Sequence, residues 1–374
     1  MCARLLHFGL KGNELADLRV LIAGGGTGGH IIPALAVARE LKTRHGAEVH
    51  FVGTERGLET RLVPAAGFKL HLIHVGPLKN VSLATRLRTL TDLPRSLFAC
   101  RRLVREFAPD AVLGVGGYAS GPGMAAALWA RVPTMAFEPN AMPGLANRLV
   151  GKRVKAAAVC FPAAAKWFCN AEVTGVPVRP EFFTVAEQTA SVPHLLVFGG
   201  SQGARIFNET LPKMVKALLD AVPGLTVLHQ AGARHAEATQ AAFATSGADA
   251  TRWEVRAFVD AMPAEFARAS LVMARSGAST VAELAAAGRA SLLVPFAAAA
   301  DDHQTRNAEE MEKAGGAVLL RETELKEPEK LLRTLIDLLG APERLKRMAA
   351  AAKTEAHPGA AERIADRLAE LAGK

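Results

Sequence analysis

Residues 20–33, with the sequence VLIAGGGTGGHIIP, constrain the fold of this chain more than any other segment. The apolar residues 20–22 predict a buried strand, and a loop of five glycines and one threonine follows. Apolar residues recurring from 31 to 41 predict a mostly buried helix, with Pro33 in its first turn. Glycines allow positive φ, and the free N–H groups at a helix N-terminus attract anions. The segment therefore predicts an anion site, most often one for phosphate.

The same order of elements returns about 175 residues later. Residues 195–198 predict a strand, 199–203 (GGSQG) a glycine loop, and 204–211 the start of a helix. The chain has 374 residues, which is more than one ordinary core holds. Two such units, each early in its half of the chain, predict two α/β domains that face each other.

Further strands are expected in both halves, at 49–53, 70–75, 111–115, 133–137, 225–230, 253–258, 271–274 and 291–295. Because helical segments separate them, they predict parallel sheets with right-handed crossovers. A second glycine loop, 114–123 (GVGGYASGPG), falls on the same sheet edge as the first, where open α/β sheets bind ligands. Glu138 follows the strand at 133–137. It is either a catalytic or substrate-orienting carboxylate, or a helix cap or loop hydrogen-bond acceptor.

The formal net charge of +9 points to an anionic partner: nucleic acid, a membrane surface or a phosphorylated ligand. Aromatic residues make up only 5% of the chain, which argues against a base-stacking surface for single-stranded nucleic acid. No apolar run reaches the roughly 18 residues that a membrane-spanning helix needs. Residues 1–18 lack the features of a signal peptide, and we expect a loose extension or a helix lying on the first domain.

Positive charge is concentrated in residues 79–106. Seven cations there are opposed by two acids, Asp92 and Glu106, and leucines are interleaved with them. The cations are Lys79, Arg86, Arg88, Arg95, Arg101, Arg102 and Arg105. The pattern fits either an amphipathic pair of helices packed on the sheet or a basic, partly apolar face that binds an anionic membrane. On such a membrane each basic residue contributes about 1 kcal/mol.

Gly24, Gly26 and Gly29 also satisfy GxGxxG, the dinucleotide-binding fingerprint. Such a site needs an acid at the end of the second strand to bind the ribose, and Glu55 lies past that position. An NAD-dependent oxidoreductase is therefore a weak alternative. His30 stands at the start of the predicted helix. It is either a cap-region residue bonded to backbone or a general base that titrates near neutral pH.

Three segments in the first half, GGGTGGHIIPALAVA, GVGGYASGPG and EPNAMPG, resemble the acceptor-domain signatures of the MurG family of N-acetylglucosaminyltransferases. In the second half, GGSQGAR, RSGASTVAE and DDHQTRNA resemble the donor-domain signatures of this family. The resemblance covers residues 19–355. Two residues depart from the family pattern, because Pro139 replaces a glutamine and Val176 replaces an asparagine.

The resemblance implies the GT-B fold, in which two Rossmann-like, doubly wound parallel-sheet domains face each other across a cleft. We expect an acceptor domain at 1–179 and a UDP-sugar donor domain at 180–357, which includes a linker at 180–193. A C-terminal helix at 358–374 is expected to pack back on the acceptor domain. These boundaries follow the positions of the matched motifs.

The resemblance also implies an activity. The family moves N-acetylglucosamine from UDP-N-acetylglucosamine to the muramyl 4-hydroxyl of lipid I, with inversion, which gives the lipid II of peptidoglycan synthesis. It implies a peripheral enzyme on the cytoplasmic face of the bacterial inner membrane, without a cofactor. Contacts with other wall-synthesis enzymes are left open, and nucleic acid is not an expected partner.

The family's site residues can be carried over where the motifs match. The uracil is held by the backbone near Phe258 and Val259, the ribose by Glu283, and the sugar hydroxyls by Gln304 with His303. Further donor-site residues are Thr27, Gly28, Gly29, Asn140, Arg179, Ser201, Gln202, Gly203 and Asn208. The acceptor diphosphate suits two cradles, one formed by Thr27, Gly28 and Gly29 and the other by Gly116, Gly117 and Tyr118.

Negative charge develops on the leaving diphosphate, and many glycosyltransferases neutralise it with a metal held by a DxD pair. This sequence contains no DxD. The N–H groups of loop 199–203 and the Arg179 cation offer an alternative, which predicts transfer without a metal. His30 is the first choice for the general base, and Glu138 is the second, as the base or as the group that orients His30. A transferase of the same fold acting on a diacylglycerol is the alternative function, although it would not need a second diphosphate cradle.

Overall fold

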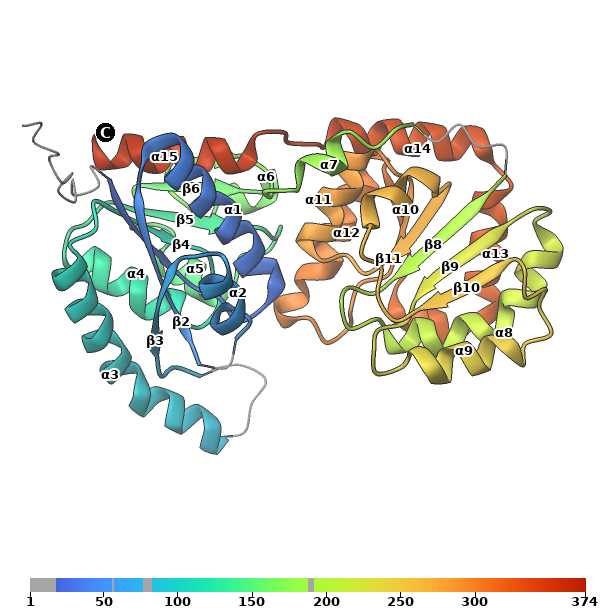
Figure 1. Ribbon diagram of the computed structural model, residues 1–374, viewed down its shortest axis with the longest axis horizontal. Helices are drawn as coiled ribbons and strands as arrows, with labels where there is room; N and C mark the ends of the chain where they lie inside the picture. Colours follow the sequence, from blue (N-terminus) through green and yellow to red (C-terminus); the bar gives the residue numbers. More distant parts are fainter. Residues whose placement is uncertain (1–17, 56, 77–82, 188–191) are drawn as a thin grey trace, which may run out of the picture.

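The computed structural model of the chain describes residues 18–55, 57–76, 83–187 and 192–374. The extension expected at 1–17, residues 79–82 of the basic region and residues 188–191 of the linker lie outside this part, as do the side chains of residues 83–90. Two lobes are present, each built on a parallel sheet that helices cover on both faces (Figure 1). The fold class predicted from the sequence is therefore confirmed.

The first sheet has seven strands in the order β3-β2-β1-β4-β5-β6-β7. Its strands are β1 (Arg19–Ala23), β2 (Glu48–Thr54), β3 (Lys69–Ile73), β4 (Ala111–Gly114), β5 (Thr134–Glu138), β6 (Ala156–Val159) and β7 (Ala171–Val173). The helices of this half are α1 (Gly28–His45), α2 (Glu59–Ala65), α3 (Leu83–Phe107), α4 (Ser120–Trp129), α5 (Leu145–Val150) and α6 (Pro162–Ala165). Strand order reverses between β1 and β4, so the loops that follow these two strands lie side by side at the carboxyl edge.

The second sheet has six strands in the order β10-β9-β8-β11-β12-β13. Its strands are β8 (His194–Phe198), β9 (Thr226–Gln230), β10 (Trp253–Arg256), β11 (Leu271–Ala274), β12 (Ser291–Leu293) and β13 (Ala317–Leu319). The helices that follow β7 are α7 (Pro180–Phe183), α8 (Arg205–Ala221), α9 (Ala236–Ala244), α10 (Met262–Arg268), α11 (Ala278–Ala287), α12 (His303–Lys313), α13 (Pro328–Leu339), α14 (Pro342–Thr354) and α15 (Ala360–Ala372). Two 3₁₀ turns, η1 (Ala300–Asp302) and η2 (Glu322–Lys326), lie beside α12 and α13.

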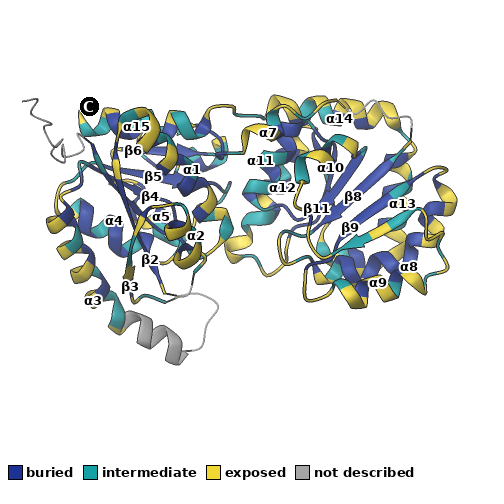
Figure 2. Cartoon of the chain, viewed as in Figure 1, coloured by how far each residue is buried: buried dark blue, intermediate teal, exposed yellow. Residues whose placement is uncertain are grey.

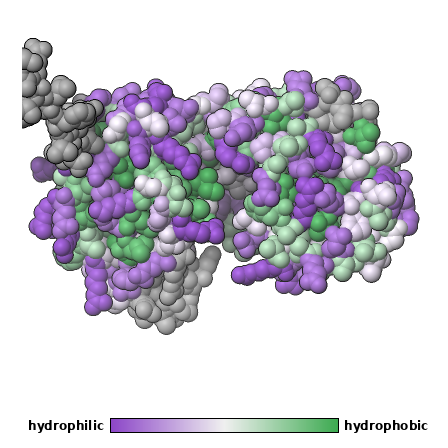
Figure 3. Space-filling model, viewed as in Figure 1, coloured by the Kyte–Doolittle hydropathy of each residue, from purple (hydrophilic) through white to green (hydrophobic). Residues whose placement is uncertain are grey.

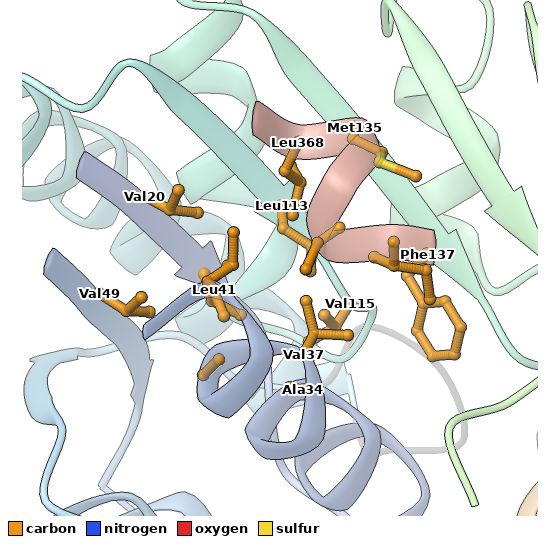
Figure 4. Close-up of a cluster of buried hydrophobic side chains, with 14 of the residues drawn as sticks. Val20, Ala34, Val37, Leu41, Val49, Leu113, Val115, Met135, Phe137 and Leu368 are labelled. Carbon is orange, nitrogen blue, oxygen red and sulfur yellow. The ribbon is translucent and has the colours of Figure 1, made fainter. Parts of the chain in front are cut away.

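Each sheet is buried on both faces, as parallel sheets are, and Figure 2 shows the buried strands inside both lobes. In the first lobe, Ala34, Val37 and Leu41 of α1 pack against β1 and β4 (Figure 4). Leu368 of α15 belongs to the same cluster, so the last helix lies on the first lobe beside α1. The chain therefore crosses from one lobe to the other twice, near residue 179 and again between α14 and α15.

All the strands predicted from the sequence are present, and β6, β7 and β13 are additional. Two local predictions were wrong. Pro33 is the sixth residue of α1 rather than part of its first turn, because the N–H groups of His30 and Ile31 already bond to the Thr27 carbonyl. The alternative of a pair of helices within 79–106 is also wrong over the described residues from 83 onward, where a single helix, α3, contains Pro94.

Candidate active site

The two glycine loops of the first lobe touch each other through their backbones. The N–H of Gly25 donates to the carbonyl of Gly116 at 3.3 Å. A Cβ on Gly24 would lie 2.3 Å from that same oxygen, and one on Gly117 would lie 2.2 Å from the Gly25 carbonyl oxygen. Since any side chain would push the loops apart, these glycines bring the two predicted cradles into one surface.

A buried carboxylate that was not predicted from the sequence holds the first glycine loop in place. Glu59 is fully buried and accepts hydrogen bonds from the N–H of Gly26 at 2.7 Å and from the N–H and hydroxyl of Thr54, both at 2.9 Å. A Cβ on Gly25 would lie 2.6 Å from its carboxyl carbon. The first cradle thus already holds one internal anion, and the N–H groups left for a ligand begin at residues 27–29.

Thr27, Gly28 and Gly29 form the open part of this loop. Thr27 and Gly29 are exposed, and the Thr27 hydroxyl does not cap its own helix. Across the contact, Tyr118 is exposed while Gly116 is buried against His30. The predicted acceptor residues therefore lie together on one rim, as the strand order requires.

His30 lies between the two loops, where a Cβ on Gly116 would be 2.9 Å from its Cε1. The ring keeps part of its surface exposed, but Nδ1 is buried and has no hydrogen-bond partner among the described residues. Burial lowers the pKa of His30 to about 4, although the Val115 carbonyl acts in the opposite direction. The charge of His303 in the second lobe also lowers this pKa. At neutral pH the ring is uncharged and able to accept a proton.

Glu138 is buried at the end of β5, and protein donors surround it. Oε1 accepts hydrogen bonds from the backbone and side-chain N–H of Asn140, at 3.0 and 3.1 Å. Oε2 accepts from Gly144 N at 3.1 Å and from Asn147 Nδ2 at 2.9 Å. Burial raises the pKa of Glu138, and these four hydrogen bonds oppose the shift. All four donors lie within residues 140–147. The geometry therefore favours Glu138 as a hydrogen-bond acceptor that holds its own loop over Glu138 as a group that transfers a proton.

The glycine loop of the second lobe is held in a similar way. Gly203 N donates to the Gly200 carbonyl at 2.9 Å, and a Cβ on Gly203 would lie 1.9 Å from the carbonyl oxygen of Ala231. Asn208 is buried, with Nδ2 on the Ala231 carbonyl at 3.0 Å and Oδ1 2.7 Å from His229 Nε2. Its side chain thus holds the neighbouring loop, while Ser201 and Gln202 are exposed at the helix start.

Glu283 of α11 and Arg179, which directly precedes α7, are an acid and a base on two helices that pack together. Burial raises the pKa of Glu283 to about 7, and the Arg179 guanidinium acts against this shift. Arg179 lies over the ring of Phe182, 5.0 Å from its centroid. Of the two residues expected at the uracil, Phe258 is exposed and Val259 is buried.

The segment 296–307 follows β12 and comprises a loop, η1 and the start of α12. Gln304 Oε1 accepts from Phe296 N at 3.0 Å, and the Gln304 carbonyl accepts from the Ser276 hydroxyl at 2.8 Å. His303 Nδ1 lies 2.6 Å from the Ala300 carbonyl oxygen. Asp301 and Asp302 both have φ of 54°, a left-handed conformation that is uncommon outside glycine.

Two further polar groups were missed from the sequence. Arg275 is buried and bonds to Glu322 at 3.1 Å and to the Pro295 carbonyl at 2.9 Å, which ties the loop after β12 to η2. Asn307 is fully buried and bonds to both lobes. Both lie inside or beside matched motifs, but their partners come from distant segments, and no local pattern could have indicated them.

The set of loops can be compared with known proteins. Residues 20–159 match the model of the glycosyltransferase family 28 N-terminal domain, and residues 194–364 match that of the C-terminal domain. A protein from Solibacter usitatus (strain Ellin6076) is 46% identical over 355 residues, which cover 94% of this chain and 96% of that protein. Its name is UDP-N-acetylglucosamine--N-acetylmuramyl-(pentapeptide) pyrophosphoryl-undecaprenol N-acetylglucosamine transferase. The crystal structure of Acinetobacter baumannii MurG superposes with a TM-score of 0.82 at 32% identity, over 95% of this chain and 100% of that chain.

The chain belongs to the MurG family. A relative from Stutzerimonas stutzeri (strain A1501) with the same name is 45% identical over 94% of this chain and 98% of its own length. The calicheamicin glycosyltransferase CalG4 shares the fold, with a TM-score of 0.69 at 19% identity over 96% of this chain and 98% of its own. Membership excludes the oxidoreductase alternative, and the structure agrees, since Glu55 is exposed and lies 3.4 Å from His74 rather than at the glycine loop.

Proposed function

We propose that this chain transfers N-acetylglucosamine from UDP-N-acetylglucosamine to the 4-hydroxyl of the muramyl residue of lipid I, which yields lipid II. The full-length similarity to MurG relatives supports the donor and the acceptor. The observation that carries the proposal is the contact between Gly25 and Gly116, because it builds one broad backbone surface in the first lobe from two glycine loops. An acceptor that carries a lipid diphosphate needs such a surface, whereas a diacylglycerol acceptor carries no diphosphate.

The donor is expected to bind to the second lobe. The backbone at Phe258 and Val259 would hold the uracil, Glu283 the ribose, and Gln304 with His303 the sugar hydroxyls. Ser201 and Gln202 offer N–H groups in the loop before α8, Gly203 shapes that loop through its bond to the Gly200 carbonyl, and Arg179 adds a cation. These groups can stabilise the charge that develops on the leaving UDP, because they are already oriented before the reaction. Transfer would then proceed without a metal ion.

The acceptor is expected to place its diphosphate on residues 27–29 and 116–118 and its sugar hydroxyl at His30. An uncharged His30 can take the hydroxyl proton as the oxygen attacks the anomeric carbon from the face opposite UDP, which inverts the configuration. Glu138 fits the role of a positioning residue, since it orders the loop that carries Asn140.

We further propose that α3 binds the anionic surface of the cytoplasmic face of the membrane. Cys100 and Val104 pack on the sheet, while Phe98 points outward beside the exposed Arg95 and Arg102. Arg101 lies 4.2 Å from the ring centroid of Trp129, which is also exposed. Cations and aromatic rings on one surface suit an anionic lipid interface. No helix in the described part of the chain is long and apolar enough to cross a membrane.

The deciding experiment measures transfer of labelled N-acetylglucosamine from UDP to a short-chain lipid I analogue in the presence of EDTA. UDP-glucose as donor and a diacylglycerol as acceptor are run beside it. We expect transfer only from UDP-N-acetylglucosamine and only to the lipid I analogue, at a rate that EDTA does not change. Tight UDP binding with transfer to the diacylglycerol would favour the alternative function. Loss of activity in EDTA that added metal restores would contradict the metal-free mechanism.

A further inference from the structure

Asn307 of α12 is a fully buried polar residue whose hydrogen bonds join the two lobes. Its Oδ1 accepts from the backbone N–H of Ala141 at 2.9 Å, and its Nδ2 lies 3.2 Å from Asn140 Oδ1. Both partners belong to the loop after β5 in the first lobe. The same Nδ2 group donates to the Ser276 carbonyl of the second lobe at 3.1 Å. The side chain therefore bonds on both sides of the junction.

The neighbouring groups determine how two hydrogen-bonded side-chain amides, those of Asn307 and Asn140, are oriented. An N–H can only donate and a carbonyl can only accept, so Ala141 and Ser276 fix which end of the Asn307 amide carries oxygen. The Glu138 carboxylate requires the nitrogen of Asn140 on its side, which leaves Asn140 Oδ1 facing Asn307. Asn140 retains one N–H and one lone pair for a ligand. This relay of hydrogen bonds, from Glu138 through Asn140 and Asn307 to Ser276, can therefore form with only one orientation of the two side-chain amides.

Both ends of this relay lie next to groups that the proposed function uses. Asn307 follows Gln304 by one helical turn on α12, and Ser276 also bonds to the Gln304 backbone. At the other end, the loop at 138–144 carries Asn140. A residue that only stabilised the second lobe would bond within that lobe, but two of the three bonds of Asn307 cross to the first lobe.

We propose that Asn307 is a positioning residue for the transfer reaction, which docks the loop at 138–144 onto α12 and so sets the distance between the donor sugar and the acceptor hydroxyl. This inference rests on the proposed function. It assigns Asn307 no contact with either substrate. Its effect is transmitted through Asn140 and the backbone of Ala141.

The test is the substitution Asn307→Asp, which keeps the shape of the side chain but replaces both donated hydrogen bonds with contacts between oxygens. Because a buried acceptor left without its donor is costly, kcat should fall at least 10-fold. The Kd of UDP should stay within twofold of the wild-type value, since none of the residues expected to hold the uracil or the ribose (Phe258, Val259 and Glu283) is among the hydrogen-bond partners of Asn307. Asn307→Ala serves as a second variant that places no new charge in the junction and should lower kcat in the same way.

The control is Asp301→Asn, which removes the ion pair between Arg148 and Asp301, another contact between the lobes, at 3.1 Å. Both side chains keep some contact with solvent (23% and 24% exposed), so water can replace the lost ion pair, and asparagine tolerates the positive φ of residue 301. We expect kcat within twofold of the wild type. An equal loss in Asp301→Asn would show that any loosened junction slows the enzyme, and the specific role of Asn307 would be refuted.

Hydrogen–deuterium exchange provides a readout that does not depend on turnover. The peptide covering 139–144 should exchange at least 10-fold faster in both Asn307 variants, because the N–H of Ala141 loses its docked position. If the wild type fails to transfer sugar but this exchange still rises, the proposed function is wrong and the docking stands. Unchanged exchange and unchanged kcat in the variants would overturn the inference, as would a loss of UDP affinity equal to the loss of kcat.

Discussion

Glu59 accepts a hydrogen bond from the backbone N–H of Gly26 at 2.7 Å, so the loop expected to bind a ligand's phosphate already holds a carboxylate of its own. The carboxylate fixes the turn between β1 and α1 and directs the remaining N–H groups outward. It also accounts for nearby glycines, because a Cβ on Gly57 would lie 1.9 Å from Glu59 Oε2. The glycine loop is therefore shaped by an internal anion before any substrate arrives.

Replacing this carboxylate with its amide should destabilise the first lobe. In Glu59→Gln, one end of the side chain becomes a donor that faces Gly26 N or Thr54 N, so a buried N–H loses its acceptor. We expect the free energy of unfolding to fall by about 1–3 kcal/mol. Urea denaturation measures this, with Glu55→Gln as an exposed control that should change it by less than about 0.5 kcal/mol. Equal stability of the two variants would contradict the role assigned to Glu59.

Gly203 and Gly247 form a matched pair for the second lobe, because both have φ of +73°. Around Gly247 the nearest atom to an added Cβ is 3.6 Å away, whereas at Gly203 it is the Ala231 carbonyl oxygen at 1.9 Å. Gly247→Ala should cost about 1–2 kcal/mol through its backbone conformation alone. Gly203→Ala should cost about 1–3 kcal/mol more and weaken UDP binding. Similar unfolding curves and UDP affinities would show that the contact between the loops does not matter.

The elements of the fold could largely be predicted because their signals are local. A run of apolar residues, a glycine turn and helical spacing occur together at β1 and again at β8, and both were found. The strands that were missed are short, and β6 consists of three alanines and a valine, residues that do not distinguish a strand from a helix. Pro33 was misplaced because the helix begins on glycines, which are poor helix formers and gave no start signal.

Site residues could be predicted from the sequence only where their role depends on the segment in which they stand. His30 and Glu138 stand at strand and helix ends, where the sequence pattern marks them. Asn307 lies within a recognised motif, but its partner Ala141 is 166 positions away, and this pairing depends on how the two lobes meet. Long-range hydrogen bonds leave no periodic trace in a single sequence, which is why Asn307 and Glu59 came from the structure alone.

Donor binding should depend on pH through Glu283. Burial raises the pKa of this carboxyl to about 7, so it becomes protonated as the pH falls below neutrality and then no longer accepts as an anion from the ribose hydroxyls. The KM for UDP-N-acetylglucosamine should rise several-fold between pH 8 and pH 6. Initial rates over this range test the expectation, with Glu283→Gln giving a high KM that pH does not change. A pH-independent KM in the wild type would mean that Glu283 does not bind the ribose as an anion.

The stability of the protein should fall in mild acid because of His229. Burial lowers its pKa to about 3 from 6.5, so the unfolded state takes up a proton at a higher pH than the folded state. The stabilisation is fully present above pH 6.5 and is lost as the pH decreases. From pH 7 to pH 5 the loss is about 2 kcal/mol from this residue. Denaturation at both pH values should show a smaller loss in His229→Gln than in the exposed control His235→Gln. Equal losses would exclude His229 as the source.

His30 should be the residue whose removal most reduces turnover. In His30→Ala we expect kcat to fall by roughly 10²–10⁴-fold, the range for loss of a general base. The pKa of about 4 predicts that the wild-type kcat at saturating donor stays level from pH 8 to pH 5, even where Glu283 raises the KM. Glu138→Ala should also lower kcat, but by releasing the loop at 138–144, so its exchange would increase as in the Asn307 variants. Near-normal turnover in His30→Ala, together with complete loss in Glu138→Ala without faster loop exchange, would instead identify Glu138 as the base.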